Sequence, residues 1–158
     1  GAVSSQDQLV KNLNYVEKAV NDGANLRVGG KQINKETGGF YMEPTIFSNV
    51  SNDMKIAQDE VFGPVLSVIK CKDEVDAIKI ANDTVYGLAS YFYSENIARC
   101  WKIAEKLEYG MVGINEGLIS TEIAPFGGIK FSGQGREGSK YGIEDYLDIK
   151  YMCFGNII

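Results

Sequence analysis

The sequence predicts an α/β fold in which a parallel sheet is flanked by helices. Three apolar runs of strand length lie at residues 65–69, 89–93 and 111–114, and segments with helical spacing of apolar residues separate them. Short connections between alternating strands and helices favour parallel pairing with right-handed crossovers. The length of 158 residues indicates one domain. We place it at residues 1–145 and expect a final strand within 146–158.

The first predicted element is an amphipathic helix. Ser5 is followed three residues later by Gln8, which is the spacing of a capping box, and Gly23 is a natural stop just past the helix. Its core face is predicted from apolar residues at helical spacing, which are Leu9, Leu13, Val16 and Val20.

Shorter elements follow up to residue 60. We expect a strand at 26–28 that ends at two glycines, a loop or hairpin tip at 31–39, and an extended segment at 41–47. Pro44 within the extended segment favours an edge or irregular strand, because proline cannot donate to a ladder. A short helical or loop segment is expected at 53–58.

The second half of the chain carries the remaining strands and helices. Asp73 is expected to cap a helix that ends near Asn82, and a second helix is expected at 97–107. The core candidates of that helix are Trp101, Ile103, Ala104 and Leu107. Residues 115–138 form a long glycine-rich loop, and loops of that length are usually functional. A short helix at 139–145 and a strand at 146–154 complete the prediction.

Composition excludes several classes of protein. The net charge is −5 without a basic stripe, which argues against nucleic-acid binding. The sequence has no histidine, and its three cysteines are widely spaced, so we expect no metal site and no disulfide framework. The cysteines are expected to be small buried or half-buried residues. This cysteine pattern favours a reducing, cytoplasmic setting. The sequence has no apolar run long enough for a membrane span and no signal-peptide pattern at its start, so we expect no membrane partner.

Three motifs have simple structural interpretations when each is taken alone. Gly133, Gly135 and Gly138 match G-x-G-x-x-G, but no clean strand precedes them and no acidic partner follows about 20 residues later within this sequence. We therefore interpret this segment as a glycine turn that leads into a helix. Residues 60–64 (EVFGP) and 125–128 (PFGG) would likewise be ordinary turns.

Taken together, the motifs resemble the aldehyde dehydrogenase superfamily. Residues 60–64 resemble its E-x-F-G-P motif, and residues 81–89 (ANDTVYGLA) resemble A-N-x-x-x-Y/F-G-L-A. Residues 110–115 (GMVGIN) and 125–133 (PFGGIKFSG) follow in the family's order, so the resemblance covers essentially the whole chain. Residues 113–120 (GINEGLIS) and 135–147 (GREGSKYGIEDYL) are similar to succinate-semialdehyde dehydrogenases.

The resemblance implies an NAD or NADP cofactor. Glu60 matches the carboxylate that accepts hydrogen bonds from a cofactor ribose, and Phe62 matches the aromatic residue near the nicotinamide. Gln8 and Lys11, on one face of the first helix, match ribose-contacting positions more weakly.

The resemblance also implies a small semialdehyde substrate and a homo-oligomer. Ser120 matches the serine that binds the distal carboxylate of succinate semialdehyde, and Phe126 matches an aromatic residue of the aldehyde tunnel. Residues 1–145 then correspond to part of the catalytic domain, and residues 146–158 to a strand that pairs with a neighbouring subunit.

The family's catalytic residues have no counterpart in this sequence. Its cysteine nucleophile, which forms a thiohemiacetal with the aldehyde, lies in a G-Q-x-C context, and its general-base glutamate lies in an E-L-G-G-K context. Neither context occurs here. We therefore expect the C-terminal portion of a larger dehydrogenase, inactive by itself because covalent catalysis requires the nucleophile. The alternatives are a non-catalytic nucleotide-binding module and an assembly module.

Overall fold

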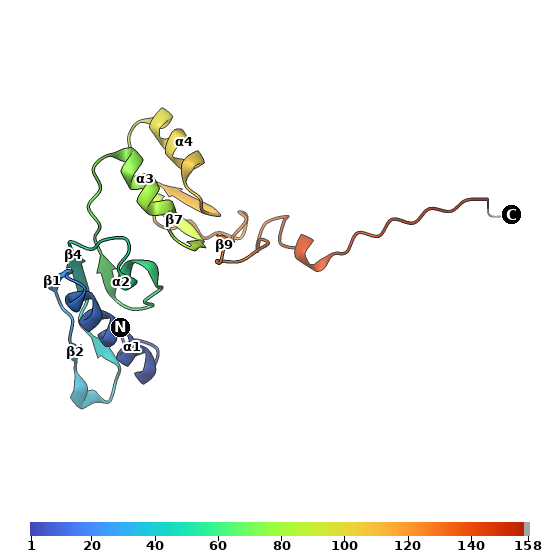
Figure 1. The fold of residues 1–158 in the computed structure, drawn as a ribbon. Coiled ribbons are helices and arrows are strands. Elements are labelled where there is room, and N and C mark those ends of the chain that lie inside the picture. Colours follow the sequence, from blue (N-terminus) through green and yellow to red (C-terminus); the bar gives the residue numbers. More distant parts are fainter. Residues whose placement is uncertain (157–158) are drawn as a thin grey trace. The chain divides into compact units, whose positions relative to one another are not determined.

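A computed structural model describes residues 1–156 of the chain. Two compact units are present, of which the first spans Gly1–Asp83 and the second begins at Thr84. Each unit contains its own helices and strands (Figure 1).

The first unit contains three α-helices, one 3-10 helix and five strands. Its elements are α1 (Gln6–Asn21), β1 (Asn25–Val28), β2 (Gln32–Ile33), the 3-10 helix η1 (Lys35–Thr37), β3 (Tyr41–Met42), β4 (Thr45–Ser48), α2 (Lys55–Gln58), β5 (Val65–Ser67) and α3 (Glu74–Asn82). Strand β4 is the middle strand of a sheet, antiparallel to β1 and parallel to β5. Strands β2 and β3 form a small antiparallel hairpin, as the turn-rich tip at 31–39 predicts.

The two helix caps predicted in this unit, at the starts of α1 and α3, are confirmed. The Ser5 Oγ accepts the backbone N–H of Gln8 at 3.1 Å at the start of α1. The Asp73 carboxylate accepts the N–H of Asp76 at 2.9 Å at the start of α3. Such caps satisfy N–H groups that have no partner within the helix and contribute about 1 kcal/mol each. The capping box is only half formed, however, because the Gln8 side chain donates elsewhere.

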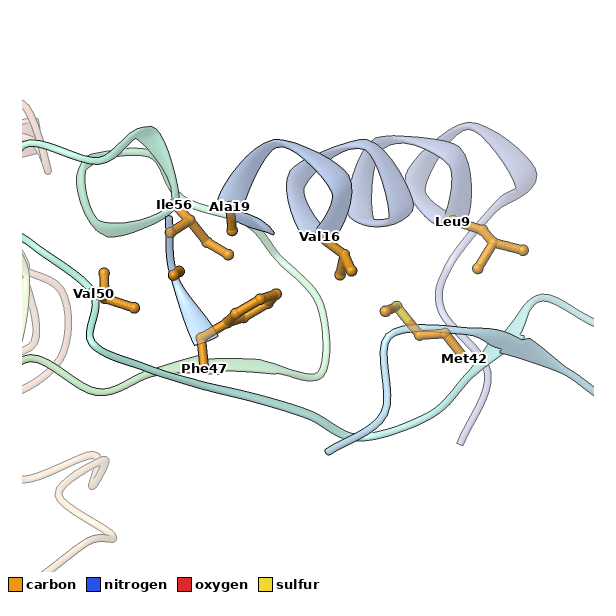
Figure 2. Packing of buried hydrophobic residues seen from close by; sticks show 8 residues of the cluster. Leu9, Val16, Ala19, Met42, Phe47, Val50 and Ile56 are labelled. Carbon is orange, nitrogen blue, oxygen red and sulfur yellow. The ribbon is translucent and has the colours of Figure 1, made fainter. Parts of the chain in front are cut away.

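The core of the first unit lies between α1 and the sheet. Figure 2 shows Leu9, Val16 and Ala19 pointing from α1 toward Phe47 and Met42. Phe47 is fully buried, and burial of such a side chain contributes roughly 1.5–3 kcal/mol. The prediction that Val20 belongs to the core is wrong, because Val20 is 48% exposed. The inner face of the helix instead includes the polar residue Asn12.

The second unit contains one α-helix and two strand pairs among the described residues. Its elements are β6 (Tyr86–Gly87), β7 (Ala89–Phe92), α4 (Ile97–Lys106), β8 (Met111–Ile114), β9 (Ile129–Lys130) and the 3-10 helix η2 (Glu144–Tyr146). Strands β7 and β8 are parallel and are joined through α4, whereas β6 and β9 are antiparallel. The α/β class and the parallel β7–β8 pair agree with the prediction. The expected single parallel sheet of three strands is wrong, because β5 pairs with β4 in a separate sheet. Strand β9, which pairs with β6, interrupts the long loop that we predicted at residues 115–138.

Two predictions about buried residues need correction. Trp101 is 70% exposed and donates its indole N–H to Glu105 at 3.0 Å, so it lies on the outer face of α4. The buried residue of α4 is Cys100. Cys71 and Cys153 are exposed, contrary to the prediction that all three cysteines are at least half-buried. They lie outside the regular helices and strands, where neighbouring segments cover side chains less.

The C-terminal elements also differ from the prediction. Residues 139–143 form turns and η2 is only three residues long, so the expected helix at 139–145 is absent. The expected strand at 146–154 is absent as well, because the described residues after Tyr146 pair with no strand of this chain. A strand needs a hydrogen-bonding neighbour. The proposed division of the chain into residues 1–145 and 146–158 remains a prediction.

Candidate functional site

Glu60 and Phe62 project from the short segment 59–64 that joins α2 to β5. Both side chains are exposed, and Phe62 is 74% accessible to solvent. Phe62 also has a left-handed backbone with φ of +56°. This conformation costs a residue with a Cβ roughly 1–2 kcal/mol. A large exposed ring held in a costly conformation is typical of a functional position.

Three side chains on one face of α1 fix the backbone of this segment. The Tyr15 hydroxyl donates to the Asp59 carboxylate at 2.7 Å. The Gln8 amide nitrogen donates to the Val61 carbonyl at 2.9 Å and to the side-chain oxygen of Asn12 at 2.7 Å. Asn12 is fully buried, so its orientation is restricted by packing.

Gly63 and Pro64 complete the attachment. A Cβ on Gly63 would lie 2.1 Å from the Asn12 amide nitrogen, so only glycine permits this close approach. The Pro64 carbonyl accepts the backbone N–H of Thr45 at 2.8 Å, which fixes the segment to β4. Residues 59, 61 and 63 therefore contact α1, whereas Glu60 and Phe62 are presented to solvent.

The two presented residues border one open pocket of about 500 Å³, the Glu60 pocket. Its floor is partly apolar and includes Val65 and Ile69. A carboxylate accepts hydrogen bonds only, and an exposed phenyl ring offers a flat apolar face. This arrangement suits a ligand that carries hydroxyl donors beside a planar ring.

The structure places the two weaker cofactor candidates differently. Gln8 lies against the segment that carries Glu60, but its amide is already bonded to Val61 and Asn12. Lys11 lies on the outer face of α1 in a separate pocket, with its Nζ 5.8 Å from the centre of the Tyr15 ring. Their assignment as ribose contacts stays a prediction.

Sequence reasoning missed the residues that position Glu60 and Phe62. Asn12 and Tyr15 lie four and seven residues after Gln8, so the three share one face of α1. Polar residues at this helical spacing, on a face that is otherwise apolar, are the signal that could have identified them.

The two substrate candidates lie in the second unit. Ser120 is exposed in the loop that follows β8. Phe126 is half-buried, and its backbone exchanges two hydrogen bonds with Glu137, at 2.9 and 2.7 Å. Phe126 lines a pocket of about 390 Å³ that Gly127, Gly128 and Gly135 also line. Ser120 lies outside this lining.

The G-x-G-x-x-G segment is a glycine turn, as interpreted from the sequence. Gly133, Gly135 and Gly138 have φ values of +117°, +74° and +65°. A Cβ on Gly135 would lie 2.0 Å from the Asp145 carboxylate, whose oxygen accepts the Arg136 N–H at 3.2 Å. The glycines thus serve the packing of their own loop, and turns rather than a helix follow them.

Other types of site find no support in the part of the chain that is described. Residues 1–156 contain no group of three or more cysteines and carboxylates placed to hold a metal ion. The helices in the same range are too short or too polar to cross a membrane. The Cys100 thiol is buried, with its sulfur 3.5 Å from the Ser94 carbonyl.

The sequence and the structure together define a domain of the aldehyde dehydrogenase type. The profile of the aldehyde dehydrogenase family matches residues 1–152, and the chain belongs to this family.

The similar proteins include several semialdehyde dehydrogenases. The chain is 55% identical to mitochondrial succinate-semialdehyde dehydrogenase of Oryza sativa, over 90% of this chain and 27% of that protein. It is 56% identical to glutarate-semialdehyde dehydrogenase of Pseudomonas aeruginosa, over 90% of this chain and 29% of that protein. It is 50% identical to the NADP⁺-dependent succinate-semialdehyde dehydrogenase of Escherichia coli, over 98% and 32%. The chain thus spans about a third or less of their length.

Solved structures show the same fold. An E. coli NADP-dependent enzyme superposes with a TM-score of 0.88 at 50% identity, over 96% of this chain and 31% of that one. The P. syringae indole-3-acetaldehyde dehydrogenase in complex with NAD⁺ superposes with a TM-score of 0.90 at 45% identity, over 92% and 30%.

Proposed function

We propose that this chain is part of an NAD(P)-dependent aldehyde dehydrogenase that oxidises succinate semialdehyde, or a closely related acidic semialdehyde, to the acid. The names of the similar proteins support both the cofactor and the substrate class. The observation that carries the proposal is the joint presentation of Glu60 and Phe62 on one fixed segment. That segment coincides with the E-x-F-G-P motif.

The Glu60 pocket fits one part of a nicotinamide dinucleotide. Glu60 is exposed, and its carboxylate can accept hydrogen bonds from both hydroxyls of a ribose. The exposed Phe62 ring can pack beside the nicotinamide, and the left-handed backbone at Phe62 turns this ring outward. The bound cofactor supplies the hydride acceptor for aldehyde oxidation. Within this chain, Glu60 and Phe62 bind and orient it.

The second unit is proposed to recognise the aldehyde. The Ser120 hydroxyl can donate to the distal carboxylate of the substrate, and the half-buried Phe126 ring can pack against its carbon chain. A hydroxyl donor selects an acidic substrate only together with cationic groups, which the resemblance places in other parts of the enzyme.

The sequence contains neither motif that carries the family's catalytic residues. We propose that the nucleophilic cysteine and the general base belong to other parts of the enzyme, and that this chain alone is inactive. None of the three cysteines lies in the lining of the Glu60 pocket. The competing proposal, a stand-alone nucleotide-binding module on Gly133–Gly138, is disfavoured because the Asp145 carboxylate fills the space beside Gly135.

We also propose that residues 146–158 join subunits into a homo-oligomer in the cytoplasm. Within the described part of this segment, residues 148–156 belong to no strand pair and carry exposed apolar side chains, among them Ile149 and Tyr151. Unpaired backbone next to apolar side chains is a template for pairing with another strand. Deletion of 146–158 should lower the oligomeric state in sedimentation velocity, and an unchanged state would contradict this proposal.

The test of the cofactor role uses the complete enzyme with Glu60→Gln. A lost hydrogen bond to a charged group costs about 1.5–3 kcal/mol, so the KM for the nicotinamide cofactor should rise by roughly ten- to a hundredfold. The KM for the aldehyde should stay within about twofold. Glu36→Gln, on the exposed turn between β2 and β3, is the control and should change neither KM. Equal behaviour of the two variants would refute the assignment of Glu60.

A further inference from the structure

The loop that carries Ser120 makes few packing contacts, and its conformation depends on hydrogen bonds. Leu118 is 90% exposed and Ile123 is 80% exposed, so apolar burial contributes little to the conformation of this loop. Its ends are nevertheless fixed. It begins after β8 and reaches Glu122, whose carbonyl accepts the Ser139 N–H at 2.9 Å.

Asn115 fixes the start of the loop. Its side chain accepts the Ser94 N–H at 2.7 Å and donates to the Ser94 carbonyl at 2.8 Å. Its own N–H donates to the Phe92 carbonyl at 2.9 Å, which continues the parallel pairing of β7 and β8. Asn115 has a left-handed backbone with φ of +56°, and this turns the chain away from the strand.

Glu116 fixes the next two residues. One oxygen of its carboxylate accepts the N–H of Gly117 at 2.8 Å and that of Leu118 at 2.9 Å. The Leu118 bond and then the Gly117 bond are the main reasons why the pKa of Glu116 lies below its ordinary value. The ionised carboxylate thus folds its own loop into a tight turn, two residues before Ser120.

We propose that Glu116 is a positioning residue for substrate specificity, which acts by holding the turn 116–118 so that Ser120 meets the distal carboxylate of an acidic semialdehyde. This inference rests on the proposed function and adds to it, since no part of the resemblance assigns a role to Glu116. The alternative mechanism is electrostatic: an exposed carboxylate near Ser120 would repel an acidic substrate.

Two variants of the complete enzyme separate these mechanisms, with succinate semialdehyde compared against butanal, which has the same carbon count and no distal carboxylate. Loss of two charge-assisted bonds in Glu116→Ala should raise the KM for succinate semialdehyde by about tenfold or more. The KM for butanal should stay within about twofold. Glu116→Gln keeps an acceptor oxygen and should restore most of the affinity. Lower KM values for the acidic substrate in both variants would overturn the proposal in favour of repulsion. An equal loss with both aldehydes would overturn it in favour of a general structural role.

Ser120→Ala tests the proposed function separately. If this variant keeps its preference for succinate semialdehyde, the substrate role of Ser120 fails and the inference fails with it. If Ser120→Ala loses the preference and Glu116→Ala keeps it, only the inference is refuted.

Amide hydrogen exchange on the present chain gives a test that does not depend on catalysis. The amides of Gly117 and Leu118 should exchange at least about tenfold faster in Glu116→Ala than in the wild type, because their acceptor is lost. The Asn115 amide, bonded to Phe92, should keep its rate. Unchanged exchange at Gly117 and Leu118 would overturn the inference.

Discussion

The left-handed backbone at Phe62 makes a prediction about stability that the structure allows us to work out. The perturbation is a pair of variants, Phe62→Ala and Phe62→Gly. Both remove the same ring, which is 74% exposed, so the ring's lost contacts cancel in the comparison. What remains is the cost of a Cβ at φ of +56°.

The magnitude follows from two opposing terms. A left-handed residue with a Cβ is disfavoured by roughly 1–2 kcal/mol, and glycine escapes this cost. Glycine loses more backbone freedom on folding, which offsets about 0.5–1 kcal/mol. Phe62→Gly should therefore be more stable than Phe62→Ala by about 0.5–1 kcal/mol, the difference between the two terms.

The assay is urea unfolding of the present chain followed by circular dichroism, with a matched pair at Lys79. Lys79 is exposed within α3, in the same unit as Phe62, and its backbone is helical. There Lys79→Gly should be less stable than Lys79→Ala by about 1 kcal/mol. The opposite order at the two positions is the predicted result. If glycine is less stable than alanine by the same amount at both positions, the backbone at Phe62 is not strained, and the proposed cost of its left-handed conformation is wrong.

Other parts of the fold give further predictions. Gly63→Ala should destabilise the chain by about 1–3 kcal/mol in urea unfolding, because its Cβ would displace the buried Asn12 amide; a neutral result would refute the close approach. Thr45→Val, nearly the same in shape, should cost about 1–2 kcal/mol because the Thr45 hydroxyl accepts the Gly30 N–H at 2.9 Å, and a stability equal to wild type would contradict this role. Thiol labelling followed by mass spectrometry should modify two cysteines rapidly and Cys100 only on unfolding; fast modification of all three would exclude its burial.

The sequence was sufficient where local rules decide the structure. The caps at Ser5 and Asp73 and the helices that follow them are specified within a few neighbouring residues, and the structure has them as predicted. The parallel β7–β8 pair could be predicted because a helix separates two short apolar runs.

The sequence was insufficient where distant segments decide the structure. Residue 20 of α1 is apolar but faces solvent, and the polar Asn12 is buried because it accepts from the Gln8 amide, which itself donates to Val61, 53 positions away in sequence. The exposure of Trp101 likewise depends on which face of α4 meets β7 and β8. The spacing of apolar residues indicates that a segment is helical, but in a short helix it does not determine which side faces the core.

In the candidate site, too, some features could be predicted from the sequence and others could not. The family resemblance predicts Glu60 and Phe62 as cofactor contacts, but only the structure shows how α1 holds the segment that carries them. The turn that Glu116 forms was not visible in the sequence either. It depends on the direction of one side chain toward two backbone N–H groups.

The most direct test of the account is the formation of reduced nicotinamide from NAD⁺ and from NADP⁺ with succinate semialdehyde, using this chain alone with its intact mass confirmed. We predict no turnover, because the lining of the Glu60 pocket, the proposed cofactor site, contains no cysteine. Clear turnover, abolished by substitution of Cys71, Cys100 or Cys153, would contradict the proposed division of labour and would place the nucleophile within this chain.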